Sequence, residues 1–153
     1  MRCYTKYTEN ILDSDTADAL YLFLKDSINW EDGIKSIKGY TRKAKPLNTG
    51  EIPEIDYAIM KALHKMTTTK YIIMGIYLNY YQDGKMWTPN HSHKGTHQMV
   101  ISLGQNRELT VSKKRYNMKN GSAIIFGSSV HGVPKDNSVN GRISIATFML
   151  PIN

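Results

Sequence analysis

A succession of short apolar segments, punctuated by glycines, fills the chain from Tyr71 onward. Apolar and β-branched runs of this length, bounded by turn residues, predict β-strands. We expect seven strands, over residues 71–81, 87–93, 97–103, 108–113, 122–126, 130–133 and 142–150. Many short strands in series are typical of an antiparallel double sheet, so the pattern predicts a double-stranded β-helix, or jelly-roll, barrel.

Two helices are predicted ahead of these strands. Asp13 or Ser14 can cap the first, and apolar residues then recur at helical spacing. Pro53 opens the second, which runs to about Met66. Between them, residues 39–55 are rich in Lys, Gly and Pro and predict a basic loop. We therefore expect one mainly-β domain over residues 1–153, with 1–70 as helical and strand support and 71–153 as the jelly-roll core.

The net charge of +7 is unevenly distributed along the sequence. Residues 1–32 carry three basic and seven acidic side chains, whereas residues 33–153 carry seventeen basic and six acidic ones. This asymmetry indicates a basic face able to meet a polyanion, although lysines that merely solvate the surface are the alternative. Cys3 is the only cysteine, and no run of about eighteen apolar residues predicts a membrane span. We expect a reducing, cytoplasmic setting with no membrane partner and no obligatory protein partner.

Three histidines form a candidate metal site. His91 and His93 are two residues apart, so a strand would place both rings on one face. His131 follows another apolar strand-like run. Neutral imidazole is a good ligand for Fe(II), Cu(II) or Ni(II), and zinc would fit three histidines equally well.

Other titratable residues compete less well as ligands. His97 could replace His93 if that ring turned outward, but a core or rim position suits it better. His64, within the second predicted helix, is expected to be a surface or packing residue. Asp83 and Asp136 are the nearest aspartates in sequence, and both fall in predicted turns.

A candidate carboxylate site follows from the last predicted strand. Arg142 would present a planar guanidinium, whose paired donors match a carboxylate. Ser144 shares its strand face, and Asn79 and Tyr81 share a face of another strand, so all three could donate to the same molecule. The alternative for Arg142 is a surface cation on an edge strand.

From about residue 11 onward, the chain resembles the AlkB-type 2-oxoglutarate and iron(II)-dependent dioxygenases. The matching pieces, in chain order, are SINWEDGI, the N-x-Y pair of LNYYQDG, the metal histidine at His91, VISLGQNRELTV, NGSAIIFGSSVHGVP and GRISIATF. The resemblance implies Fe(II) as cofactor, 2-oxoglutarate and O₂ as co-substrates, and demethylation or hydroxylation of alkylated or modified DNA or RNA bases. It implies iron ligation by His91 and His131, and 2-oxoglutarate binding by Asn79, Tyr81 and Arg142.

The chain departs from the family pattern at two positions. The family has aspartate where His93 stands, so a site of His91, His93 and His131 would carry one negative charge fewer. The family's second arginine is also missing, and Phe148 or Met149 lies at its position. We hypothesise that these two losses offset each other in charge.

The resemblance also suggests where a substrate would bind. Tyr40, Arg42, Lys43 and Lys45 are expected to grip phosphates and stack a flipped or single-stranded base, with a second basic loop at residues 113–119. The family places a substrate-covering lid between Tyr40 and the second helix, and here that segment is short. Two alternatives remain: an oxygenase of the same fold acting on a protein or small molecule, or a metal- or nucleic-acid-binding module that has lost turnover.

Overall fold

The computed structural model describes residues 4–33, 35–36, 39–40 and 42–152. In this part of the chain, helices and strands follow one another as β1 (Lys6–Thr8), α1 (Ser14–Ser27), β2 (Glu31–Asp32), β3 (Lys35–Ser36), β4 (Gly39–Tyr40), β5 (Lys43–Leu47), α2 (Pro53–Met66), β6 (Tyr71–Asp83), β7 (Thr88–His91), β8 (His97–Gly104), β9 (Arg107–Val111), β10 (Lys114–Met118), β11 (Ala123–Phe126), β12 (His131–Val133) and β13 (Asn140–Pro151).

Two antiparallel sheets form the barrel. The larger sheet has the strand order β1-β11-β8-β13-β6-β5-β2, and the smaller has the order β10-β9-β12-β7. Buried residues from both sheets, including Val100, Leu109, Phe126 and Val133, pack together between them. This arrangement is the double sheet of a jelly roll, as the sequence predicts.

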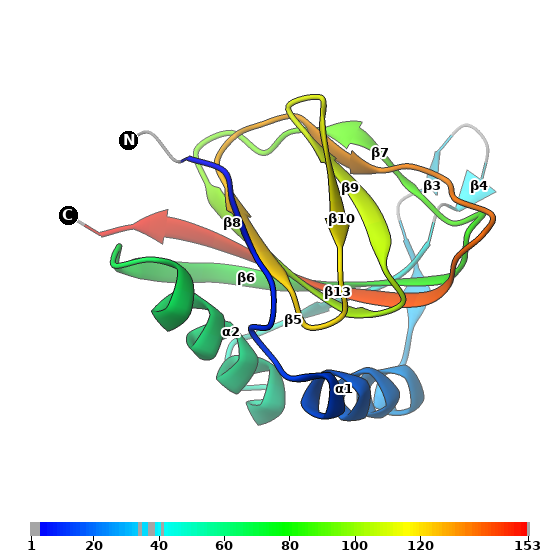
Figure 1. Cartoon of the computed structure of the whole chain (residues 1–153), viewed down its shortest axis with the longest axis horizontal. Helices are drawn as coiled ribbons and strands as arrows, with labels where there is room; N and C mark the ends of the chain where they lie inside the picture. Colours follow the sequence, from blue (N-terminus) through cyan, green and yellow to red (C-terminus); the bar gives the residue numbers. More distant parts are fainter. Residues whose placement is uncertain (1–3, 34, 37–38, 41, 153) are drawn as a thin grey trace.

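Both helices cover the outer face of the larger sheet and lie side by side beneath the long strands β6 and β13 (Figure 1). Asp13 caps α1, because its carboxylate accepts a hydrogen bond of 2.8 Å from the backbone N–H of Thr16. Leu24 of α1 and Ile59 of α2 are fully buried against the outward-facing residues of the sheet. Neither helix in the described part of the chain has the length and hydropathy of a membrane-spanning helix.

Two segments predicted as basic loops contain strands instead. Residues 43–47 form β5, which pairs with β6 near one edge of the larger sheet. Residues 114–118 form β10, which makes a hairpin with β9. These strands carry lysines and arginines on their exposed faces. Because the segments are so basic, the alternation of apolar residues that predicts a strand is not apparent in the sequence. Because residues 43–47 are a strand of the sheet, they do not form a lid over the barrel.

Candidate metal centre

Two of the three predicted metal histidines are cross-strand neighbours in the smaller sheet. His91 is the last residue of β7, and His131 is the first residue of β12. The antiparallel register places them directly opposite each other, with ring centroids 4.3 Å apart. Strand pairing therefore brings together two histidines that are forty residues apart in sequence.

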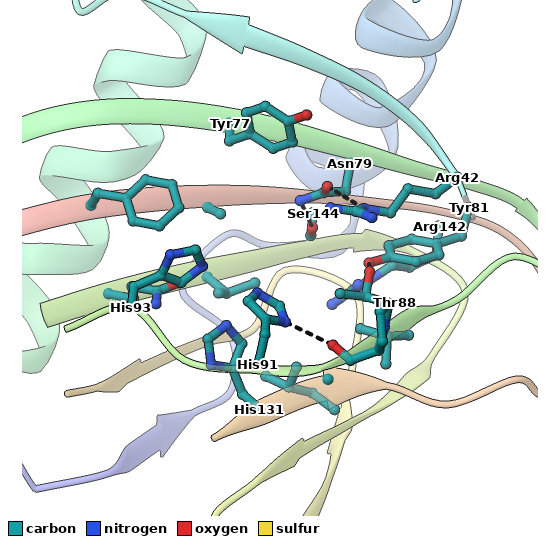
Figure 2. A pocket seen from close by; sticks show the side chains of 18 residues that line it. Arg42, Tyr77, Asn79, Tyr81, Thr88, His91, His93, His131, Arg142 and Ser144 are labelled. Atoms are coloured by element: carbon teal, nitrogen blue, oxygen red, sulfur yellow. Dashed lines mark hydrogen bonds between the residues drawn. The ribbon is translucent and has the colours of Figure 1, made fainter. Parts of the chain in front are cut away.

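His93 completes the cluster from a different position than expected. β7 ends at His91, so His93 lies in the connection to β8 rather than on the strand itself. Its ring still approaches His91 and His131, with centroid distances of 4.8 and 5.6 Å (Figure 2). One possible ligand atom from each of the three residues lies within 4.8 Å of the other two.

Backbone carbonyls orient two of the three rings. The Nδ1 of His91 lies 2.7 Å from the carbonyl oxygen of Pro89, and the Nδ1 of His131 lies 2.9 Å from that of Ser129. A carbonyl oxygen can only accept, so each Nδ1 carries the proton. Each Nε2 then keeps its lone pair for a metal, which is the usual arrangement of metal-binding histidines.

Two of the three histidines, His93 and His131, have lowered pKa values that favour the neutral form, which binds metals. The pKa of His131 is lowered to about 4, mainly by burial and also by the neighbouring His91 and His93, against the opposing effect of the hydrogen bond to Ser129. Burial also lowers the pKa of His93, with His91 as the second cause. Removing a proton therefore costs little when either ring binds a metal.

The donor set fits a divalent transition metal with open coordination positions. Metal–imidazole bonds of about 2.1 Å require neighbouring donor atoms roughly 3 Å apart. The possible donor atoms of the three histidines lie within 4.8 Å of one another, so they would move closer together on binding a metal. Three imidazoles suit iron, zinc, copper or nickel and leave further positions for a ligand.

A cavity of about 510 Å³ extends from the histidines to Arg142. Apolar side chains such as Val100, Leu109 and Val133 form much of its wall. None of the described residues that line it is Asp or Glu. The cavity is therefore an apolar chamber whose charged groups are all cationic.

Arg142 is a buried cation on the wall of this cavity. Its side chain is 1% exposed, and its Nε donates a hydrogen bond of 2.8 Å to Ser102 Oγ. No acceptor for its Nη2 lies among the described residues. Burial is the main cause that lowers the pKa of Arg142 to about 10, whereas the Tyr81 ring, 5.3 Å from the guanidinium carbon, acts in the opposite direction. Arg142 thus stays charged at neutral pH and can receive a carboxylate.

Comparisons with known proteins support the fold. No protein-family model and no curated protein sequence matches this chain. A prolyl-4-hydroxylase structure from Pseudomonas putida matches with TM-score 0.66 at 13% identity, covering 95% of this chain and 92% of that one. A Trichoplax adhaerens prolyl hydroxylase, in complex with a hypoxia inducible factor oxygen degradation domain peptide fragment, matches with TM-score 0.64 at 14% identity, covering 95% and 83%.

An oxidoreductase of the 2OG-Fe(II) oxygenase family from Burkholderia pseudomallei matches with TM-score 0.65 at 15% identity, covering 95% of this chain and 84% of that one. At these identities the likeness establishes the fold, and the predicted jelly roll is confirmed. None of the three structures bears the name of the AlkB type that the sequence motifs resemble.

The predicted keto-acid residues lie together on the cavity wall. Asn79 and Tyr81 of β6 face Ser144 and Arg142 of β13 in register (Figure 2). Asn79 Nδ2 lies 3.3 Å from Ser144 Oγ, and Tyr81 OH lies 2.6 Å from Thr88 Oγ1. These side chains form a polar wall that leads from Arg142 toward the histidines.

The predicted substrate residues separate into two groups. Arg42 lines the cavity, and its Nε donates a hydrogen bond of 2.7 Å to Asn79 Oδ1. Lys43 and Lys45 do not line it, and each forms an ion pair of 2.6 Å, with Asp32 and Glu31 respectively. Lys43 and Lys45 were expected to hold phosphates, but their charges are paired with the acidic residues of β2. The side chain of Tyr40 lies outside the described residues.

The competing ligand candidates lie away from the cluster. His97 is buried, and its Nδ1 lies 2.9 Å from the hydroxyl of Tyr71. His64 is exposed on α2, as expected. Asp83 and Asp136 accept hydrogen bonds from residues of their own turns and do not join the histidines.

Three residues with polar side chains that line the cavity escaped the sequence analysis: Gln98, Thr88 and Tyr77. Gln98 and Ser102 share one face of β8 with Val100, whereas Met99 and Ile101 lie on the other face, and the strand is almost wholly buried. Two polar residues on one face of a buried strand are a signal that this face borders an internal polar site. Phe148 also lines the cavity, with its ring centroid 5.1 Å from that of His93, whereas Met149 packs on the helix side. Phe148 therefore occupies the position facing the metal site.

Proposed function

We propose that this protein is a 2-oxoglutarate-dependent oxygenase that holds Fe(II) through His91, His93 and His131. The observation that carries the proposal is the convergence of three imidazoles in the same cavity as the buried Arg142, which can bind an anion. A dicarboxylic keto acid has the two functional ends that such a cavity would bind. One end chelates a metal, and the other pairs with a guanidinium.

The residues of this chain would position and shield the reactants. Fe(II) would supply oxidation of a substrate C–H bond by O₂, coupled to decarboxylation of 2-oxoglutarate to succinate. Arg142 would hold the distal carboxylate, with Ser144, Asn79 and Tyr81 as neighbouring hydrogen-bond donors. The apolar wall around Val100 and Leu109 would keep bulk water from the reacting groups.

We propose a polypeptide side chain as the substrate. Two of the three matched structures are prolyl hydroxylases, and one holds a peptide fragment. The ion pairs of Lys43 and Lys45 also leave fewer cations for a phosphate backbone than the sequence suggested.

A nucleic-acid base is the second candidate, in line with the AlkB-like motifs. Residues 71–153 carry nine basic and three acidic side chains. Lys113 and Lys114 are exposed at the turn of the β9–β10 hairpin. A cationic surface of this kind favours a polyanionic partner.

The enzymatic proposal is tested with purified protein under anaerobic conditions. Addition of Fe(II) and then 2-oxoglutarate is expected to produce a visible charge-transfer band, and admission of O₂ should release succinate. His131→Ala should abolish both signals, while His64→Ala, at an exposed histidine on α2, should leave them unchanged. A band without succinate release would indicate a binding module that has lost turnover. The absence of a band with the wild-type protein would contradict the proposed site.

The substrate class is tested by stimulated succinate release. Proline-containing peptides and methylated single-stranded oligonucleotides are supplied in parallel, and the product is examined by mass spectrometry. A gain of 16 mass units on a peptide, roughly one oxygen atom, would support the polypeptide proposal. Demethylation of the oligonucleotide with no change in any peptide would favour the nucleic-acid candidate instead.

A further inference from the structure

Gln98 is a buried amide on the inner wall of the barrel. It lies in β8 and alternates with Met99, which packs on the helix side of the sheet. Gln98 is only 2% exposed, and it lines the same cavity as the three histidines and Arg142. An amide at such a position needs hydrogen-bond partners, because its desolvation is otherwise unfavourable.

The carboxamide nitrogen of Gln98 has no hydrogen-bond partner within the described residues. Among the described residues, two cavity-lining side chains carry a buried nitrogen without an acceptor, namely Gln98 at Nε2 and Arg142 at Nη2. A buried donor that is left unsatisfied destabilises the folded protein. Such a cost at the wall of a cavity indicates a donor that is kept for a ligand.

The two unsatisfied donors lie at opposite ends of one interior wall. Arg142 begins the inward-facing row of β13, which continues through Ser144 and ends at Phe148. Gln98 is directly opposite Phe148 in the register between β8 and β13. Phe148 contacts His93, so Gln98 stands at the metal end of the cavity. A ligand whose carboxylate meets Arg142 would therefore present its other end to Gln98.

Directly opposite Gln98, β13 presents a side chain without a donor. Phe148 offers an apolar ring, and the three imidazoles use their free nitrogens for the metal. Rotation about the last side-chain bond can present the Gln98 N–H groups to the cavity, because no hydrogen bond within the described residues fixes the carboxamide.

We infer that Gln98 donates a hydrogen bond to the metal-end carboxylate of the bound keto acid. Gln98 is thus a second anchor of the co-substrate, and Arg142 is the first. This inference rests on the proposed function, because it takes 2-oxoglutarate as the ligand. It makes Gln98 a residue that sets co-substrate affinity at the end where the metal binds.

The experiment compares two ligands on two variants. Binding of 2-oxoglutarate and of 2-oxopentanoate, which keeps the keto-acid end but lacks the distal carboxylate, is measured by anaerobic calorimetry on the Fe(II)-loaded protein. Gln98→Met should weaken both ligands by the same factor, roughly tenfold for one hydrogen bond to a charged group. Arg142→Met should weaken 2-oxoglutarate strongly and 2-oxopentanoate little. Gln82→Met, at an exposed glutamine of β6, is the matched control and should bind as the wild type does.

Stability provides a readout that does not depend on the ligand. Gln98→Met removes an unsatisfied buried donor, so the metal-free variant should melt at a higher temperature than the wild type. Gln98→Glu, which keeps the shape but replaces the donor by an anion, should bind the keto acid more weakly than Gln98→Met does.

Three outcomes are distinguishable. Equal weakening of both ligands supports the inference. Unchanged binding by Gln98→Met, or weakening of 2-oxoglutarate alone, overturns the role of Gln98 and leaves the proposed function standing. Failure of the metal-loaded wild type to bind either ligand overturns the proposed function and this inference with it.

Discussion

At the scale of single residues, the site depends on side chains whose charges are unusual for buried positions. His131 is 6% exposed and is held neutral, whereas Arg142 is 1% exposed and stays charged. A neutral imidazole is ready to bind a metal, and a charged guanidinium is ready to bind an anion. Burial of His131 and Arg142 is therefore unfavourable without ligands. A metal at His131 and an anion at Arg142 would offset this free-energy cost.

The neutral state of His131 predicts that the metal-free protein loses stability in mild acid. Burial lowers the pKa of His131 to about 4, while an unfolded histidine titrates near about 6.5. As the pH falls from 6.5 toward 4, the unfolded chain takes up a proton that the folded chain does not, so the unfolded state is favoured. The lowered pKa of His93 acts in the same direction.

The measurement is the free energy of unfolding in urea, with chelator present, between pH 7 and pH 5. We expect a decline toward pH 5 that is smaller in His131→Asn. His64→Asn, at an exposed position, is the control and should retain the wild-type decline. An equal decline in wild type and His131→Asn would show that another group is responsible.

At the scale of helices and strands, the sequence was informative where one face is apolar. The second helix was predicted from Pro53 to about Met66, and α2 has these bounds because its buried residues recur at helical spacing. β6 was predicted over residues 71–81 and extends to Asp83. β5 and β10 were missed, because basic residues on their exposed faces resemble a loop in composition.

The assembly of the site was only partly predictable. The sequence indicated the three histidines, Arg142 and Ser144, because their residue types carry recognisable chemistry. The sequence analysis missed Gln98, whose place opposite Phe148 depends on the register of β8 with β13. It also could not show that Lys43 and Lys45 would meet acidic partners, since those ion pairs depend on the register of β2 with β5.

The close approach of β7 and β12 predicts a strong effect of a single methyl group. Gly132 lies next to His131, and a Cβ there would be 2.4 Å from Asn90 Oδ1 and 2.9 Å from the carbonyl oxygen of Thr88. Gly132→Ala should push β12 away from β7 and separate His131 from His91. We expect a loss of about 1–3 kcal/mol in unfolding free energy and weaker metal binding.

Gly75→Ala provides the matched control for this change. Gly75 lies in β6, and a Cβ there meets nothing within 4 Å. Denaturant unfolding and metal titration of both variants check the prediction. Similar behaviour of the two variants would mean that the contact of β12 with β7 does not set the metal site.

At the scale of the whole molecule, the candidate site connects the two sheets. His91 and His131 belong to the smaller sheet, whereas Arg142 and Ser144 belong to the larger one. The larger core cluster lies between the sheet and the helices, and the smaller one lies inside the barrel, where the cavity takes up space. A ligand that reaches from the histidines to Arg142 would therefore contact both sheets. It would connect them across the smaller of the two core clusters.

This arrangement predicts ordered stabilisation by metal and keto acid. At a concentration 100 times its Kd, a ligand adds about 2.7 kcal/mol of stability, which raises the Tm of a domain of this size by roughly 5–10 °C. Fe(II) should raise the Tm under anaerobic conditions, and 2-oxoglutarate should raise it further only when metal is present. Differential scanning fluorimetry with and without chelator measures both steps. An equal effect of 2-oxoglutarate on metal-free protein would contradict the arrangement.

The position of His93 outside the strand has a kinetic consequence. The rings of His91 and His131 are each fastened to a backbone carbonyl, while in the described part of the chain no hydrogen bond orients the ring of His93. Dissociation of a bound metal would then begin with release of the His93 imidazole, before His91 or His131 dissociates. The exchange rate of the metal would be governed by the connection between β7 and β8, whereas its affinity would be shared by all three histidines.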